Sequence, residues 1–108
     1  MPIYNKLVRD KIPAIIKSEG KTLSTNILSD EQYLKELRIK LQEEMQEYLE
    51  APNDVDSIEE LADVLEVIHS LTVVHNSSVK ELEQVRKQKA EKRGGFEERI
   101  FLKEVIDD

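Results

Sequence analysis

Two pairs of carboxylates at helical spacing constrain this chain more than any other feature. Glu44 and Glu47 form the first pair, Glu60 and Asp63 form the second, and both lie within residues 41–66. On a helix, residues three apart are neighbours on the surface, so each pair can direct two carboxylates at one point. We expect two consecutive helices joined by a short connection. Four carboxylates brought together repel each other unless a cation lies between them, and carboxylate oxygens are ligands that Mg²⁺ prefers.

The second acidic pair lies on a segment that is apolar around most of its circumference. At about 100° per residue, its apolar face comprises Leu61, Val64, Leu65, Val67, Ile68, Leu71 and Val74. Such a helix is expected to be buried, with Glu60 inside the apolar arc and Asp63 at its margin. Glu44 lies at the edge of the stripe on the preceding helix, which is formed by Leu34, Leu37, Leu41, Met45 and Tyr48. Carboxylates beside buried faces need a partner, because burying an unpaired charge is costly.

The same acids also have a purely structural interpretation. Ser57 and Glu60 have the spacing of a capping box, in which the glutamate bonds back to the backbone at the start of a helix. Lysine or arginine side chains from elsewhere in the chain can also neutralise such acids as ion pairs. The residues alone therefore leave both a metal site and a set of caps and ion pairs open.

Composition favours one all-α domain over residues 1–108. The chain has 36% charged residues and only three glycines and three prolines, which suits helices with few tight turns. A net charge of −7 argues against a nucleic-acid polymer as partner. Without cysteine there is no disulfide framework or thiol catalysis. No signal peptide or membrane span is visible, so a cytoplasmic protein is expected.

Capping residues and breakers predict four helices and no strand. A short helix is expected with Pro13 in its first turn and Gly20 after its end. Ser29, three residues before Gln32, predicts the start of a long helix over 30–51. A second long helix is expected from after Ser57 to about position 75. A third long helix is expected over 78–94, with a capping box between its first residue and the glutamate at position 81.

Basic residues near both ends of the chain are candidates for binding phosphate. Lys6 and Arg9 lie in the N-terminal segment, and Lys89 and Arg93 lie on the third long helix. Lysine and arginine recognise phosphate groups, which fits a chain that otherwise carries excess negative charge. The alternatives are a solvated N-terminal arm and basic residues that favour the helix dipole at a C-terminal end.

The sequence resembles the all-α nucleoside triphosphate pyrophosphohydrolases, the group that contains MazG and phosphoribosyl-ATP pyrophosphohydrolase. The resemblance rests on the pattern ExxE, a spacer and ExxD, within the segments KLQEEMQEYLE and ELADVLEVI. The opening YNKLVRDKIP and the closing KAEKRGGFEERIFL resemble a small subgroup of single-domain members. The resemblance thus covers nearly the whole chain.

This resemblance implies hydrolysis of a nucleoside triphosphate between its α and β phosphates, giving a monophosphate and pyrophosphate. Mg²⁺ would be held by Glu44, Glu47, Glu60 and Asp63. One of these carboxylates, for which we choose Glu47, would hold or deprotonate the attacking water. Lys6, Arg9, Lys89 and Arg93 are candidates for the phosphates by charge and position, and Asn5 or Phe96 for the sugar or base.

The resemblance also implies a helical bundle that is completed by oligomerisation. Members generally form homodimers or homotetramers with active sites between helices of neighbouring subunits. Three functions stay open at this point. They are a nucleotide pyrophosphohydrolase with a housekeeping role, the same chemistry on phosphoribosyl-ATP in histidine biosynthesis, and a non-catalytic helical oligomer or binding module.

Overall fold

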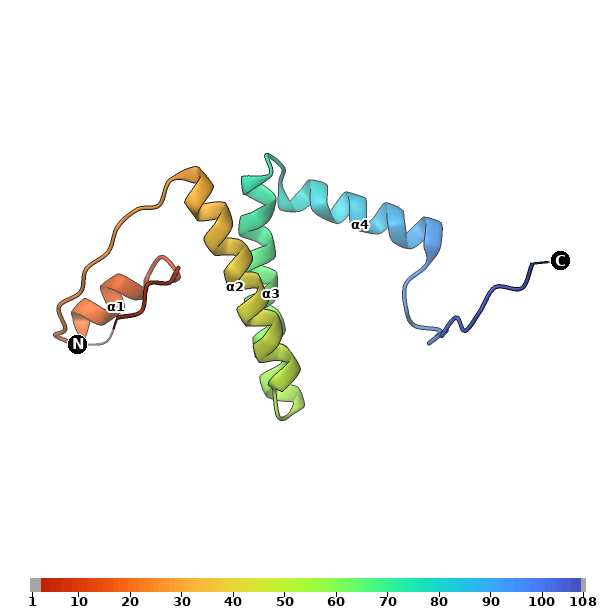
Figure 1. Ribbon diagram of the computed structural model, residues 1–108, viewed down its shortest axis with the longest axis horizontal. Coiled ribbons are helices and arrows are strands. Elements are labelled where there is room, and N and C mark those ends of the chain that lie inside the picture. The colour runs from red at the N-terminus through yellow and green to blue at the C-terminus, as the bar shows by residue number, and fades with distance from the viewer. Residues whose placement is uncertain (1–2, 108) are drawn as a thin grey trace.

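A computed structural model describes residues 3–107, and these residues contain four helices and no strand (Figure 1). The helices are α1 (Ile12–Ser18), α2 (Asp30–Glu50), α3 (Asp54–Val74) and α4 (Val79–Arg93). The prediction of an all-α fold is therefore confirmed. None of the helices in the described range is both long and apolar enough to cross a bilayer.

Most helix ends lie where the capping residues predict them. The Ser29 hydroxyl accepts the backbone N–H of Gln32, and the Gln32 side chain accepts the backbone N–H of Ser29, which completes the capping box of α2. Ser78 caps α4 by accepting the backbone N–H of Glu81. The Glu81 carboxylate does not bond back to the Ser78 backbone; it accepts the Ser77 hydroxyl. The α4 box is thus only half formed.

The start of α3 differs from the prediction. The helix begins at Asp54, and its N-cap is Asn53, whose side-chain oxygen accepts the backbone N–H of Asp56. Ser57 lies inside the first turn and donates its hydroxyl to the Asn53 carbonyl. Asp54 and Asp56 favour this earlier start, because acidic residues in a first turn interact favourably with the helix dipole.

The centre of the molecule is an antiparallel pair formed by α2 and α3 (Figure 1). The connection between them, residues 51–53, is short enough to fold the second helix back along the first. Leu37 on α2 and Val67 on α3 are the buried apolar side chains of this pair. The pair is the part of the fold that positions the acidic residues.

The chain is much more open than a compact domain of its length. Its radius of gyration is 18.9 Å, whereas about 13 Å is expected for a compact chain of this size. Its accessible surface is 10255 Å², against about 6,200 Å² expected for a folded monomer of this mass. In Figure 1, α4 extends away from the α2–α3 pair, and the C-terminal segment continues outward from it.

The expectation that α3 is buried is not met within this one chain. Leu61 and Leu65, which belong to its predicted apolar face, remain 43% and 51% exposed. The C-terminal apolar residues do not dock on the body either, since Phe101 and Ile106 are 86% and 77% exposed. The apolar pattern of α3 therefore exceeds what its own α2 covers.

Candidate metal centre

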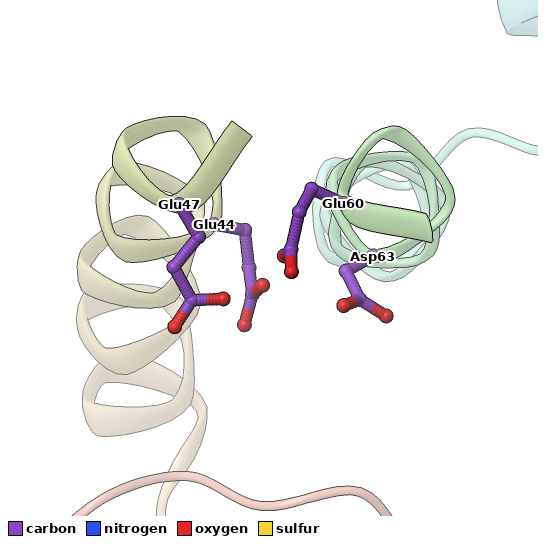
Figure 2. Close-up of side chains that lie close together, drawn as sticks. All are labelled: Glu44, Glu47, Glu60 and Asp63. Atoms are coloured by element: carbon purple, nitrogen blue, oxygen red, sulfur yellow. The ribbon is translucent and has the colours of Figure 1, made fainter. Parts of the chain in front are cut away.

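Four carboxylates converge between α2 and α3. Glu44 and Glu47 extend from α2, and Glu60 and Asp63 extend from α3 into the same space (Figure 2). One oxygen from each residue lies within 4.8 Å of one oxygen from every other. The predicted convergence of the two acidic pairs is thus present in the fold.

The convergence follows from the helix pairing. Each pair is spaced by three residues, so both of its members lie on one side of their helix. Leu37 and Val67, buried between the helices, hold α2 and α3 side by side. The acidic faces then meet in the half of the pair nearer the connection, with Glu47 in the last turn of α2 and Glu60 nearly two turns inside α3.

The deepest carboxylate of the cluster is Glu44, which is only 8% exposed. Its Oε1 lies 3.6 Å from the Lys40 ammonium, one turn earlier on α2. Its Oε2 is buried without a hydrogen-bond partner, and the same is true of Oε2 of Glu60. Buried polar atoms are almost always partnered in folded proteins, so these two oxygens call for a ligand that accepts their lone pairs.

The electrostatic environment of Glu44 also favours a cation in the cluster. Burial raises the pKa of the Glu44 carboxyl, the adjacent Glu47 carboxylate raises it further, and Lys40 offsets only part of this change. Glu44 is therefore an acid whose charge is poorly compensated by the protein around it. A cation at the centre of the cluster would supply the missing compensation.

The donor set fits a hard divalent cation such as Mg²⁺ or Ca²⁺. All four groups are carboxylates, with no histidine or cysteine among them, and hard oxygen donors are the ligands of Mg²⁺ and Ca²⁺ in preference to softer metals. Glu47 is exposed while the other three residues are buried or half-buried. The cluster is therefore closed on one side and reachable from solvent on the other, as a site that binds a cation together with a soluble substrate must be.

No protein-family model, curated protein or solved structure matches this chain. Function must therefore be argued from the residues of the cluster and from what surrounds it.

One of the four predicted phosphate-binding residues reaches the cluster. The Arg9 guanidinium donates a 2.6 Å hydrogen bond to Oδ1 of Asp63. The rest of its donors stay accessible, because the side chain is 57% exposed. Lys6, three residues earlier, lies over the Tyr4 ring at 5.5 Å from its centroid and has no ion pair with the acids in the described part of the chain.

The other two predicted phosphate-binding residues are not brought to the cluster by this chain. Lys89 and Arg93 lie on the half of α4 that extends away from the α2–α3 pair (Figure 1). Across residues 3–107, neither forms an ion pair with Glu44, Glu47, Glu60 or Asp63. Phe96, a candidate for the base, is 97% exposed just beyond α4. Lys89, Arg93 and Phe96 could therefore take their predicted roles only at the acidic cluster of a second copy of the chain.

The capping interpretation of Glu60 is wrong. Because α3 starts at Asp54, Glu60 lies nearly two turns inside the helix and does not reach the backbone at its start. The Lys40–Glu44 pair is a feature that the sequence analysis missed, although its i, i+4 spacing is visible in the sequence. Together with Arg9, which pairs with Asp63, this lysine leaves Glu47 and Glu60 without an ion pair among residues 3–107.

Proposed function

We propose that this chain is an Mg²⁺-dependent pyrophosphohydrolase that cuts a nucleoside triphosphate between its α and β phosphates. The observation that carries the proposal is the cluster of four carboxylates in which buried oxygens of Glu44 and Glu60 have no partner. A cluster serving only as helix caps or ion pairs would have its buried oxygens satisfied by the protein. The resemblance of the sequence to the all-α pyrophosphohydrolases supplies the reaction.

Glu44, Glu47, Glu60 and Asp63 would hold the metal in this proposal. When bound, Mg²⁺ would neutralise charge on the triphosphate and activate water for attack. Glu47 is the exposed member of the cluster, and it is our choice for the carboxylate that holds this water and accepts its proton. Arg9 borders the cluster with free guanidinium donors, which suits bidentate contact with phosphate oxygens.

A second copy of the chain belongs to the same proposal. The chain exposes roughly 4,000 Å² more surface than a compact monomer of its mass would, whereas a standard interface covers only about 800 Å² on each partner. The exposed apolar residues of α3, such as Leu65, lie where another helix can cover them. In a homodimer or homotetramer, Lys89 and Arg93 would serve the cluster of a neighbouring subunit. A cytoplasmic location, where nucleotides are abundant, completes the proposal.

The test is pyrophosphate release from ribo- and deoxynucleoside triphosphates and from phosphoribosyl-ATP, with Mg²⁺ and with EDTA. Wild type is compared with Glu60→Gln and with Glu59→Gln. Glu59 is an exposed neighbour on the same helix, outside the cluster, so it controls for a lost charge on α3. We expect release that requires Mg²⁺, persists in Glu59→Gln and is lost in Glu60→Gln.

The substrate panel separates the functions that the sequence leaves open. Turnover of phosphoribosyl-ATP alone would assign the chain to that branch of the chemistry. Release of orthophosphate in place of pyrophosphate would mean that another bond is cut. Absence of any turnover, from a folded protein that ignores Mg²⁺, would favour a non-catalytic helical oligomer or binding module.

A further inference from the structure

The Arg9–Asp63 ion pair is the one side-chain hydrogen bond or ion pair between the N-terminal segment and the helical pair among the described residues 3–107. The helix that follows Arg9, α1, packs against none of the other helices in that range. Residues 19–29, which connect α1 to α2, form no helix or strand. Among polar contacts, a single ion pair at the edge of the acidic cluster therefore joins this N-terminal segment, residues 3–18, to the helical pair.

That ion pair uses an atom which the proposed metal centre also needs. The guanidinium donates to Oδ1 of Asp63 at 2.6 Å, and Asp63 is one of the four acids that converge within 4.8 Å. Arg9 brings one positive charge to the cluster, whereas a divalent cation brings two and sits among all four carboxylates. The pair is also partly exposed, at 57% for Arg9 and 38% for Asp63, so solvent screens it and its strength is modest.

We propose that Arg9 is a built-in counter-ion of the acidic cluster, which a divalent cation displaces from Asp63 and thereby releases the N-terminal segment. The inference rests on the proposed metal centre, because it assigns the cation to the same carboxylates. It adds a function for residues 3–18: a strap that covers the edge of the cluster until the cation binds.

Two measurements on the full chain test the strap. The first is calorimetric titration of Mg²⁺ into wild type, Arg9→Gln and Lys11→Gln. Lys11 lies on the same segment, is exposed and forms no ion pair within residues 3–107, so its substitution removes one charge without touching Asp63. Removing the competitor should tighten Mg²⁺ binding about 1.4- to 5-fold in Arg9→Gln, the range expected for an exposed ion pair, and leave Lys11→Gln unchanged.

The second measurement is the {¹H}–¹⁵N nuclear Overhauser effect of the amides of Leu7, Val8 and Asp10, which falls as a segment becomes mobile. In wild type and Lys11→Gln, we expect Mg²⁺ to lower it. In Arg9→Gln, we expect a low value without Mg²⁺ and no further change when Mg²⁺ is added. This pattern is specific, because the variant should abolish the effect of the cation on the segment while strengthening the binding of the cation.

The outcomes distinguish the strap from the metal centre. Equal or weaker Mg²⁺ binding in Arg9→Gln, or a segment in wild type that keeps or increases its order with Mg²⁺, would overturn the strap and leave the metal centre intact. Absence of Mg²⁺ binding by wild type and both variants would overturn the metal centre, and the strap with it.

Discussion

Replacing Glu44 by glutamine should stabilise the protein when no divalent cation is present. Glu44 is the most buried acid of the cluster, and its carboxylate approaches three others within 4.8 Å. Two unit charges at that distance repel by about 0.9 kcal/mol at the dielectric constant of water and by about 3.5 kcal/mol at an effective value of 20. Glutamine removes the charge, keeps the shape, and offers an amide N–H₂ that can donate to the unpartnered Oε2 of Glu60.

The expected net gain is smaller than the sum of these repulsions. Solvent screens the exposed Glu47, and Arg9 already pairs with Asp63. The substitution also removes the Lys40–Glu44 pair, which is worth about 0.3–0.5 kcal/mol. We therefore expect Glu44→Gln to raise the unfolding free energy by about 1–2 kcal/mol. Each kcal/mol corresponds to a rise in Tm of about 4–8 °C.

Urea and thermal unfolding in EDTA at pH 7, at one fixed protomer concentration, measure this change. Glu43→Gln is the matched control, because Glu43 pairs with the same Lys40 at 3.8 Å but lies outside the cluster. The unfolding free energy of Glu43→Gln should be lower than that of wild type by up to about 0.5 kcal/mol. With Mg²⁺ at ten times its Kd, wild type and Glu43→Gln should each gain about 1.4 kcal/mol and Glu44→Gln much less. A destabilised Glu44→Gln in EDTA, or an undiminished response to Mg²⁺, would refute the reasoning.

Four further outcomes follow from the same structure. Burial raises the pKa of the Glu44 carboxyl above 4.5, so this group is uncharged at low pH and destabilises the fold only as the pH rises through the raised pKa. The advantage of Glu44→Gln in EDTA should therefore vanish below pH 4.5 and increase as the pH rises through that pKa, and an advantage that does not change with pH would contradict the assignment. Glu47→Gln should lower kcat by about 10²- to 10⁴-fold, while Glu50→Gln, one turn further along α2 and bonded to Gln46, should keep wild-type kcat; equal kcat in the two variants would remove Glu47 from the mechanism. Asn53→Ala should cost about 1 kcal/mol of unfolding free energy, measured by urea unfolding, because it removes the cap of α3. Light scattering should give a mass that is a multiple of 12.5 kDa, and a mass near that of one chain would exclude the proposed oligomer.

Local sequence signals predicted the parts of the fold that depend on near neighbours. Ser29 and Ser78 mark the starts of α2 and α4 through hydrogen bonds that span three residues. Gly94 follows the last residue of α4 with a φ of 83°, a conformation that glycine adopts most readily. The acidic pairs were predictable for the same reason, since spacing along a helix fixes the face on which each pair lies.

The remaining features depend on contacts that periodicity does not report. Two capping residues, Asn53 and Ser57, lie four positions apart, and the local pattern did not show which one begins α3. The Arg9–Asp63 pair joins residues 54 positions apart across a connector without regular structure, so neither residue signals the other. The apolar arc of α3 predicts that the helix is covered, but whether its own chain or another covers it is a property of the assembly.

The most direct test of the central claim is ³¹P NMR of a deoxynucleoside triphosphate incubated with the protein, with Mg²⁺ and with EDTA. We predict that, in the sample with Mg²⁺ but not in the sample with EDTA, the three triphosphate signals are replaced by those of a nucleoside monophosphate and pyrophosphate. A triphosphate that stays intact in the presence of Mg²⁺, or one that yields a diphosphate and orthophosphate, would contradict the claim.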